Sequence, residues 1–110
     1  MKLQEQKCVP CTSATPPLSR DEANMLHQDV PEWTLKDSAI ERTFVFKDFK
    51  EAMRFIARVA ELAEEQGHHP DIHIYYNKVR LELTTHKIKG LSENDFILAA
   101  KINTLAGSGD

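Results

Sequence analysis

The sequence predicts an α+β fold in which a four-stranded antiparallel sheet carries three helices on one face. Two alternating apolar runs, residues 72–76 and 79–85, flank a two-residue turn signal and indicate a β-hairpin. Three capping signatures mark the starts of three helices. The resulting order is helix, two strands, helix, two strands, helix (α-β-β-α-β-β-α). Because this order needs no parallel crossover, helices on one face of an antiparallel sheet are the expected packing.

The length and composition indicate one ordinary globular domain. The chain has 110 residues, of which 41% are hydrophobic and 28% charged. We expect a poorly ordered N-terminal arm over residues 1–17 and a single domain over residues 18–110. The net charge of -3 disfavours a nucleic-acid partner. The first residues lack the apolar core of a signal peptide, and no stretch has the length of a membrane span, so we predict a cytoplasmic protein.

The first half of the domain is expected to contain a helix and two strands. Ser19 and Glu22 form a capping box, and the helix that they start should end before Pro31. Residues 33–35 and 39–46 are expected as strands around a short turn. Their apolar residues alternate, except that Arg42 interrupts the alternation.

Two further helices follow. Asp48 begins the long one, and Gly67 should end it because glycine readily takes the left-handed conformation that closes many helices. One face of this helix is an apolar stripe of Phe49, Ala52, Met53, Ile56, Val59, Ala60 and Ala63. The last helix should begin at Ser92, with Asp95 in its first turn, and end near Gly107.

The turn signal Asn77-Lys78 fixes the register of the predicted hairpin. It pairs Tyr76 with Val79, Ile74 with Leu81 and Ile72 with Leu83, and places all six on one face. The other face would carry His73, Tyr75, Arg80 and Glu82. Extended to the open end, this register sets His69 opposite His86 with His68 beside them, and directly opposed Cβ atoms lie roughly 5 Å apart.

Three imidazoles at one edge of the sheet allow two kinds of chemistry. They can hold zinc with an open position for water, or they can transfer protons without a metal because imidazole titrates near neutral pH. His73 lies roughly 13 Å along the strand from His69, so we expect it outside the cluster. Glu64, near the end of the long helix, either orients an imidazole or belongs to a solvated acidic face. No serine or cysteine lies in a recognisable nucleophile motif.

The two cysteines, Cys8 and Cys11, lie close together near the N-terminus. In a reducing compartment such a pair suggests metal binding or redox chemistry. A structural zinc site would need two more ligands, from His27 or a second subunit. We expect the pair to be an incidental feature of the N-terminal arm.

Several motifs accompany the predicted histidine cluster: Glu64, His68-His69-Pro70, Tyr76-Asn77-Lys78-Val79, Thr84-Thr85-His86, Gly90-Leu91-Ser92-Glu93 with Asp95, Phe46-Lys47-Asp48-Phe49 and Arg58-Val59-Ala60. Together they resemble the pterin-4a-carbinolamine dehydratase family over about residues 18–106. The combination of the histidine pair, the Tyr-Asn-Lys turn and the distant Thr-His is more specific than any one motif.

The resemblance implies a homodimer or homotetramer that acts on a pterin. The reaction would remove water from the 4a-hydroxytetrahydropterin left by an aromatic amino acid hydroxylase and give quinonoid dihydropterin, with no metal or other cofactor. His68 and His86 would share the acid and base roles, His69 would hold the pterin, and Glu64 would orient an imidazole. Asp95 matches a position of the family that would bind substrate, but its place in a capping motif explains it equally well.

The sequence departs from the family pattern at Ile72, where some members carry a tryptophan, so ring stacking on the pterin from this position is in doubt. Two alternatives to the dehydratase also follow. One is a protein-binding module, because animal members of the family are dimerisation cofactors of a transcription factor and the polar sheet face could pair partners. The other is a zinc hydrolase, which would contain stoichiometric metal.

Overall fold

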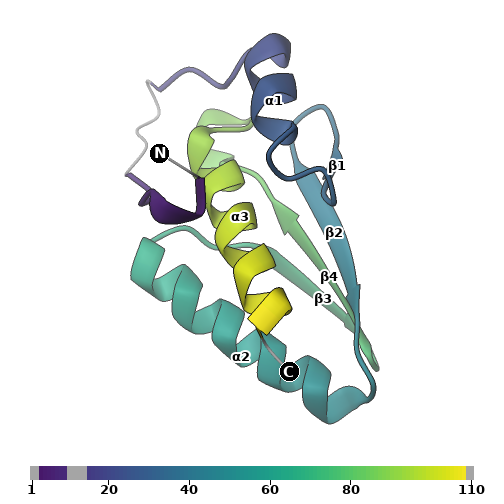
Figure 1. The fold of residues 1–110 in the computed structure, drawn as a ribbon. Coiled ribbons are helices and arrows are strands. Elements are labelled where there is room, and N and C mark those ends of the chain that lie inside the picture. Colours follow the sequence, from purple (N-terminus) through teal and green to yellow (C-terminus); the bar gives the residue numbers. More distant parts are fainter. Residues whose placement is uncertain (1–2, 10–14, 109–110) are drawn as a thin grey trace.

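Three α-helices cover one face of a four-stranded antiparallel sheet, as the computed structural model in Figure 1 shows. The model describes residues 3–9 and 15–108. The helices are α1 (Arg20–His27), α2 (Phe49–Gln66) and α3 (Glu93–Ser108), and two short 3-10 turns are η1 (Leu3–Glu5) and η2 (His86–Ile88). The predicted fold class and order of elements are confirmed.

The central pair of the sheet is β2 and β4. The strands are β1 (Thr34–Leu35), β2 (Ile40–Val45), β3 (Asp71–Tyr75) and β4 (Lys78–Leu83), in the spatial order β1-β2-β4-β3. On β4, Val79, Leu81 and Leu83 are fully buried beneath the helices. Ile72 shares the face of Leu81, as expected, but it is 37% exposed because β3 is an edge strand.

The predicted register of the hairpin is wrong by two positions. Tyr75 faces Lys78, so the turn residues are Tyr76 and Asn77. Tyr76 takes a left-handed conformation with φ of 57°. The side-chain amide of Asn77 donates to the carbonyl of Phe46 at 2.9 Å, and the backbone carbonyl of Asn77 accepts from the Phe46 N–H at 2.8 Å. These two hydrogen bonds hold the turn next to the end of β2. Because side chains alternate with a period of two, this shift keeps the residues of β3 and β4 on their predicted faces, whereas Tyr76 moves from the apolar face into the turn.

The predicted helix caps of α1 and α2 are confirmed. Ser19 Oγ accepts from the Glu22 N–H at 3.1 Å, and Glu22 Oε1 accepts from the Ser19 N–H at 2.9 Å. The bond from the Ser19 N–H, together with one from the Ser19 side chain, holds the pKa of Glu22 below its ordinary value. Asp48 Oδ1 accepts from the Glu51 N–H at 2.9 Å, and Gly67 closes α2 with φ of 67°. The sequence thus sets where both helices begin and where α2 ends.

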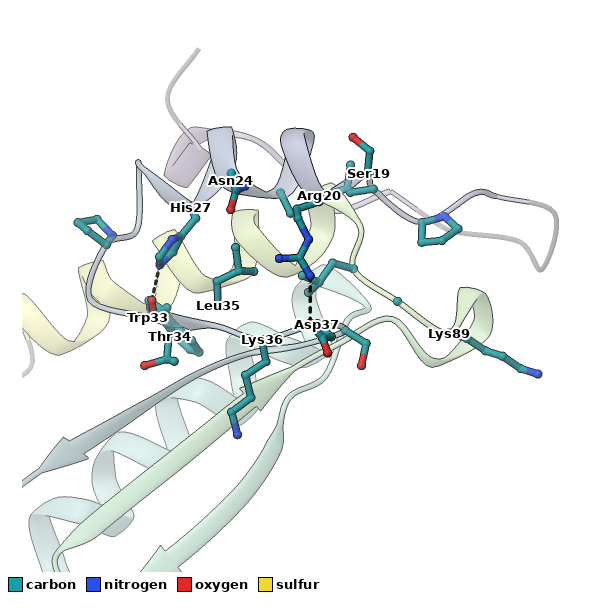
Figure 2. A pocket seen from close by; sticks show the side chains of 17 residues that line it. Ser19, Arg20, Asn24, His27, Trp33, Thr34, Leu35, Lys36, Asp37 and Lys89 are labelled. Atoms are coloured by element: carbon teal, nitrogen blue, oxygen red, sulfur yellow. Dashed lines mark hydrogen bonds and ion pairs between the residues drawn. The ribbon is translucent and has the colours of Figure 1, made fainter.

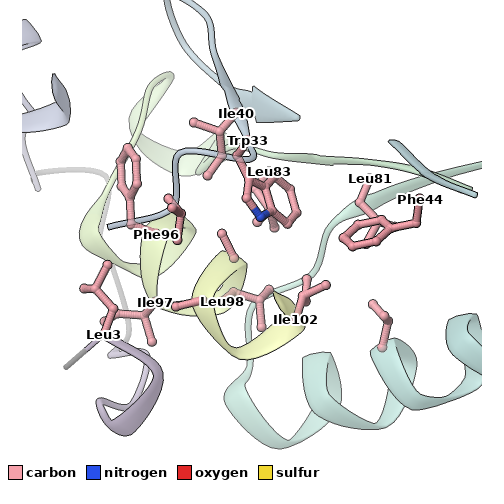
Figure 3. Close-up of a cluster of buried hydrophobic side chains, with 14 of the residues drawn as sticks. Leu3, Trp33, Ile40, Phe44, Leu81, Leu83, Phe96, Ile97, Leu98 and Ile102 are labelled. Atoms are coloured by element: carbon pink, nitrogen blue, oxygen red, sulfur yellow. The ribbon is translucent and has the colours of Figure 1, made fainter. Parts of the chain in front are cut away.

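The core fills the space between the sheet and the helices (Figure 3). Its largest fully buried apolar side chains are Trp33, Phe96, Ile40, Leu81, Leu83, Leu98 and Ile102. They come from the loop before β1, from β2 and β4, and from α3. Burial of these side chains is the main stabilising contribution to the fold, at roughly 1.5–3 kcal/mol for each fully buried large apolar side chain.

Arg42, which interrupted the apolar alternation, has a structural explanation. It lies on the helix-facing side of β2, where its Nη1 donates to Asn103 Oδ1 at 2.7 Å and its guanidinium lies 4.4 Å from the ring centre of Phe44. Trp33 Nε1 donates to the same Asn103 oxygen at 2.8 Å. The charge is therefore paired with an amide of α3 and an aromatic face, which makes its place beside the core favourable.

The N-terminal segment 3–9 packs against α3. Leu3 is buried within the core cluster, and Lys101 Nζ donates to the carbonyl of Gln4 at 3.0 Å. These contacts concern only part of the arm expected over residues 1–17, so the boundary at residue 18 stays a prediction. None of the helices within the described residues combines the length and apolar character needed to cross a membrane.

Candidate active site

The three predicted histidines line one cavity of about 230 Å³. The cavity lies where the chain leaves α2, where β4 passes into η2, and where α3 begins. The β3–β4 ladder ends at the pair Asp71 and Glu82, and His86 begins η2, so the expected strand pairing of His69 with His86 is wrong. The other residues that line the cavity are Val9, Gly67, Thr84, Thr85, Lys87 and Asn94.

His68 is the most buried of the three histidines and pairs with Asp95. Its side chain is 12% exposed, and its Nε2 lies 2.6 Å from Asp95 Oδ1. Because a carboxylate accepts hydrogen bonds, Nε2 carries a proton in this pair, and in the neutral ring Nδ1 is then the free base. The left-handed Gly67 turns the chain at the end of α2 and places His68 in this position.

Asp95 is fully buried, and both of its carboxylate oxygens accept hydrogen bonds. Its second oxygen, Oδ2, accepts from Thr85 Oγ1 at 2.9 Å and from the Ser92 N–H at 3.0 Å. The Ser92 hydroxyl lies 2.7 Å from Thr85 Oγ1. The bond to the Ser92 N–H is the predicted capping contact of α3, so one carboxylate both caps this helix and orients His68. It does not line the cavity, and the substrate-contact role implied for it by the resemblance stays a prediction.

Glu64 pairs with His69. The two side chains are both exposed, with His69 Nε2 lying 2.5 Å from Glu64 Oε2. His86 is 76% exposed, and its Nε2 lies 3.9 Å from Asp71 Oδ2. The site therefore contains one largely buried imidazole and two exposed imidazoles, each with a carboxylate near it.

Within residues 3–9 and 15–108, no group of three His, Cys, Asp or Glu side chains is arranged to hold a metal ion. His27, considered as a zinc ligand, instead lies with Nε2 2.5 Å from the carbonyl oxygen of Trp33. Cys11 lies outside the described residues, so the cysteine pair stays untested. The three cavity histidines each face a different carboxylate: His68 with Asp95, His69 with Glu64, and His86 with Asp71.

A larger cavity of about 750 Å³ lies between α1, the β1–β2 turn and residues 89–91 (Figure 2). Arg20 and Asp37 pair with each other there at 3.3 Å, and its histidine, His27, is engaged by a backbone carbonyl. Figure 2 shows Lys36 and Lys89 extending away from α1. The acidic and basic side chains labelled in Figure 2 do not point to one place in this larger cavity. We therefore take the smaller cavity, where three histidines meet, as the candidate active site.

Two features of the site were not predicted from the sequence: the pairing of His68 with Asp95, and the place of Val9 in the cavity wall. Asp95 appeared as a helix cap and as a substrate-binding position implied by the resemblance, and Thr85 only as part of a motif. The separation of 27 residues between His68 and Asp95 has no periodic signal, since it depends on how α2 and α3 pack. Val9 enters the cavity wall through a tertiary contact of the N-terminal segment, which no local pattern indicates.

Comparisons with known proteins point to one family. The family model described as pterin 4 alpha carbinolamine dehydratase matches residues 16–105. A protein of Methylococcus capsulatus provisionally named pterin-4-alpha-carbinolamine dehydratase is 51% identical over 106 residues, covering 94% of this chain and 93% of the relative. One of Cupriavidus pinatubonensis with the same provisional function is 48% identical over 107 residues, covering 96% of this chain and 92% of that relative.

Two solved structures are similar in fold. One is described as a transcriptional coactivator/pterin dehydratase from Brucella melitensis, with a TM-score of 0.78 and 38% identity over 83% of this chain and 99% of its own. The other is a pterin dehydratase-like protein described as a RuBisCO assembly factor of the alpha-carboxysome, with a TM-score of 0.57 and 26% identity over 68% of this chain and 87% of its own. From the match over residues 16–105 and these relatives, the chain belongs to the pterin 4 alpha carbinolamine dehydratase family.

Proposed function

We propose that this protein removes water from a 4a-hydroxytetrahydropterin and gives quinonoid dihydropterin, using histidines as acid and base without a metal. The observation that supports this most is the convergence of His68, His69 and His86 on one cavity, with a buried carboxylate behind His68. Family membership supports the reaction class. The substrate would come from an aromatic amino acid hydroxylase, so the protein would act in tetrahydropterin recycling in the cytoplasm.

The reaction requires two proton transfers. One acid gives a proton to the departing hydroxyl, the carbon–oxygen bond breaks, and water leaves. One base takes the proton of the adjacent ring nitrogen, whose electrons form the carbon–nitrogen double bond. Each transfer is worth about 10²–10⁴-fold in rate when a positioned side chain performs it. Two imidazoles in one cavity can supply both.

We assign the base role to His68 and the acid role to His86. The Asp95 carboxylate holds the Nε2–H of His68, leaves Nδ1 to accept the proton, and stabilises the imidazolium that results. His86 is exposed and can recover a proton from water after each turnover. His69 would hold the pterin, with its ring oriented by Glu64.

The test is a dehydration assay on chemically generated carbinolamine, with and without a chelator. The native protein should accelerate dehydration equally in both conditions. Replacing His68 and His86 together by alanine should reduce the rate to that of the uncatalysed reaction. Full activity in this double variant, or loss of native activity with the chelator, would contradict the proposal. Elemental analysis of the purified protein tests the zinc alternative directly.

A second proposed function is protein binding by a dimer or tetramer. Brucella and carboxysome relatives are described as a coactivator and an assembly factor. In this chain Phe49 and Tyr76 are both exposed and stack with ring centres 6.4 Å apart, and Met53 is exposed one helical turn beyond Phe49. Exposed aromatic and methionine side chains are typical of interaction surfaces. This surface differs from the polar sheet face of His73 that the sequence suggested.

Sedimentation equilibrium tests the oligomer proposal. Replacing Phe49 and Tyr76 by aspartate should convert a native dimer or tetramer into smaller species, because charge at an apolar contact is unfavourable. Tyr75 is exposed on the polar face of the sheet, so replacing it by aspartate should leave the molecular mass of the assembly unchanged. A native monomer at micromolar concentrations would count against this second function.

A further inference from the structure

The N-terminal segment 3–9 joins the core at one end and the candidate active site at the other. Leu3 is buried in the core cluster, and η1 packs on α3. Six residues later, Val9 lines the histidine cavity. Burial of Leu3 alone does not require the chain to be held at Val9, because the contacts at the two ends involve different neighbours. The contacts at residues 8 and 9 therefore call for a separate explanation.

Two side chains hold the backbone of residues 8 and 9 at the cavity. Gln66 Oε1, at the end of α2, accepts from the Cys8 N–H at 3.0 Å. Asn94, in the first turn of α3, accepts from the Val9 N–H through Oδ1 at 2.9 Å and donates from Nδ2 to the Val9 carbonyl at 2.6 Å. Because one amide satisfies both backbone groups of Val9, the direction of the Val9 side chain is fixed.

The two residues that make these contacts lie close to His68 and Asp95 in the sequence. Gln66 precedes His68 by two residues, and Asn94 directly precedes Asp95. Segment 3–9 thus bridges the two helix ends that carry the imidazole and its carboxylate. The Val9 side chain itself is 63% exposed, so it gains little from the core. An exposed alkyl group held rigidly at the edge of a cavity offers apolar surface to a flat ring bound there.

We propose that Val9 is a substrate-contact residue of the pterin site and that Asn94 is its positioning residue. This inference rests on the proposed function. It adds a part of the cavity wall that comes from the N-terminal segment and not from the histidine motifs. The Val9 methyl groups would pack on the pterin ring, while the ring's polar edge faces the imidazoles. Binding of substrate would be affected, whereas the proton transfers by His68 and His86 would not.

The closing experiment measures KM and kcat of dehydration for Val9→Ala, Asn94→Asp and the matched control Lys7→Ala. Lys7 is exposed in the same segment and does not line the cavity. Val9→Ala should raise KM about three- to ten-fold with little change in kcat, as loss of buried methyl contacts predicts. Lys7→Ala should leave both constants unchanged.

Asn94→Asp tests the positioning role. An aspartate loses the donor to the Val9 carbonyl, yet it suits the first turn of α3 because the helix dipole favours negative charge there. We expect KM to rise at least as much as in Val9→Ala. Hydrogen exchange is measured on Asn94→Ala, which removes both the acceptor of the Val9 N–H and the donor to the Val9 carbonyl. The Val9 amide should exchange faster in this variant, while the amides in the middle of α3 keep their native exchange rates.

Four results would contradict the inference in whole or in part. An active native protein with the same KM in Val9→Ala and Lys7→Ala would overturn it alone, and so would a fall in kcat at unchanged KM. An unchanged exchange rate of the Val9 amide in Asn94→Ala would remove the positioning role. A native protein without dehydratase activity would overturn the proposed function, and the substrate contact with it.

Discussion

At the scale of single residues, the two carboxylates nearest the histidines differ in their contact with water. Asp95 is fully buried and bonded to three partners, whereas the Glu64 side chain is 78% exposed. An interaction in the interior is not screened, while an exposed pair is typically worth about 0–1 kcal/mol. Orientation of His68 by Asp95 is therefore expected to matter much more than orientation of His69 by Glu64.

Replacing Asp95 with asparagine should lower kcat by about 10²–10⁴-fold, because the amide no longer fixes the tautomer of His68 or stabilises its cation. Steady-state kinetics and the pH profile of kcat measure this effect. Ser92→Ala is the matched control, since the Ser92 hydroxyl contacts Thr85 and not the carboxylate of Asp95. A folded Asp95→Asn protein with native kcat would contradict the assignment of His68 as base.

Glu64→Gln should change KM and kcat by no more than about three-fold, because the pair with His69 is exposed and screened. The same assay, repeated at low and high salt, measures it. A loss of kcat in Glu64→Gln as large as that in Asp95→Asn would show that exposure does not explain the difference between the two carboxylates.

At the scale of elements, the local chemistry of the chain predicted helix ends better than strand register. The caps at Ser19 and Asp48 and the stop at Gly67 depend on contacts within a few residues. The hairpin turn depends instead on Asn77, which bonds to Phe46 of a different part of the chain. The sequence placed the turn one residue too late because the left-handed Tyr76 is not a typical turn residue.

The same distinction applies to the site. The histidines still meet although their strand pairing is wrong, because the chain after α2 and the start of η2 both lie at the open end of the β3–β4 hairpin. The pairing of His68 with Asp95 depends on where α2 ends relative to the start of α3, which no spacing encodes. The contact of Val9 depends on the N-terminal segment crossing α3. Tertiary packing thus supplies the parts of the site that sequence patterns missed.

Gly67 ends α2 and sets the position of His68, the proposed base. Its Cβ would meet no atom within 4 Å, so Gly67→Ala isolates the cost of the left-handed backbone. We expect the free energy of unfolding to fall by about 1–2 kcal/mol in urea titrations. Gly67→Asn should cost less, because asparagine tolerates this conformation. Equal stability of the alanine variant and the native protein would show that the turn relaxes.

At the scale of the whole molecule, the helices cover one face of the sheet and the other face stays open to water. A half-covered sheet is stable when its open face is polar. Here Glu41 accepts from Lys36 and lies 3.3 Å from Arg80 across the strands β2 and β4. The hydrogen bond from Lys36 lowers the pKa of Glu41 most, burial opposes this, and the charges of Lys36 and Arg80 lower it further.

This arrangement predicts how stability responds to acid. Because the folded chain holds the Glu41 pKa below its ordinary 4.5, its contribution is complete above the unfolded pKa and is lost as pH falls through the folded one. Glu41→Gln should therefore be less stable than the native protein at pH 7 in urea titrations. The difference should shrink as pH falls below 4.5 and vanish once pH is below the folded pKa of Glu41. Glu61→Gln, a change at an exposed residue of α2, should track the native protein throughout. A difference for Glu41→Gln that persisted unchanged into acid would show that the side chain contributes by packing and not by its charge.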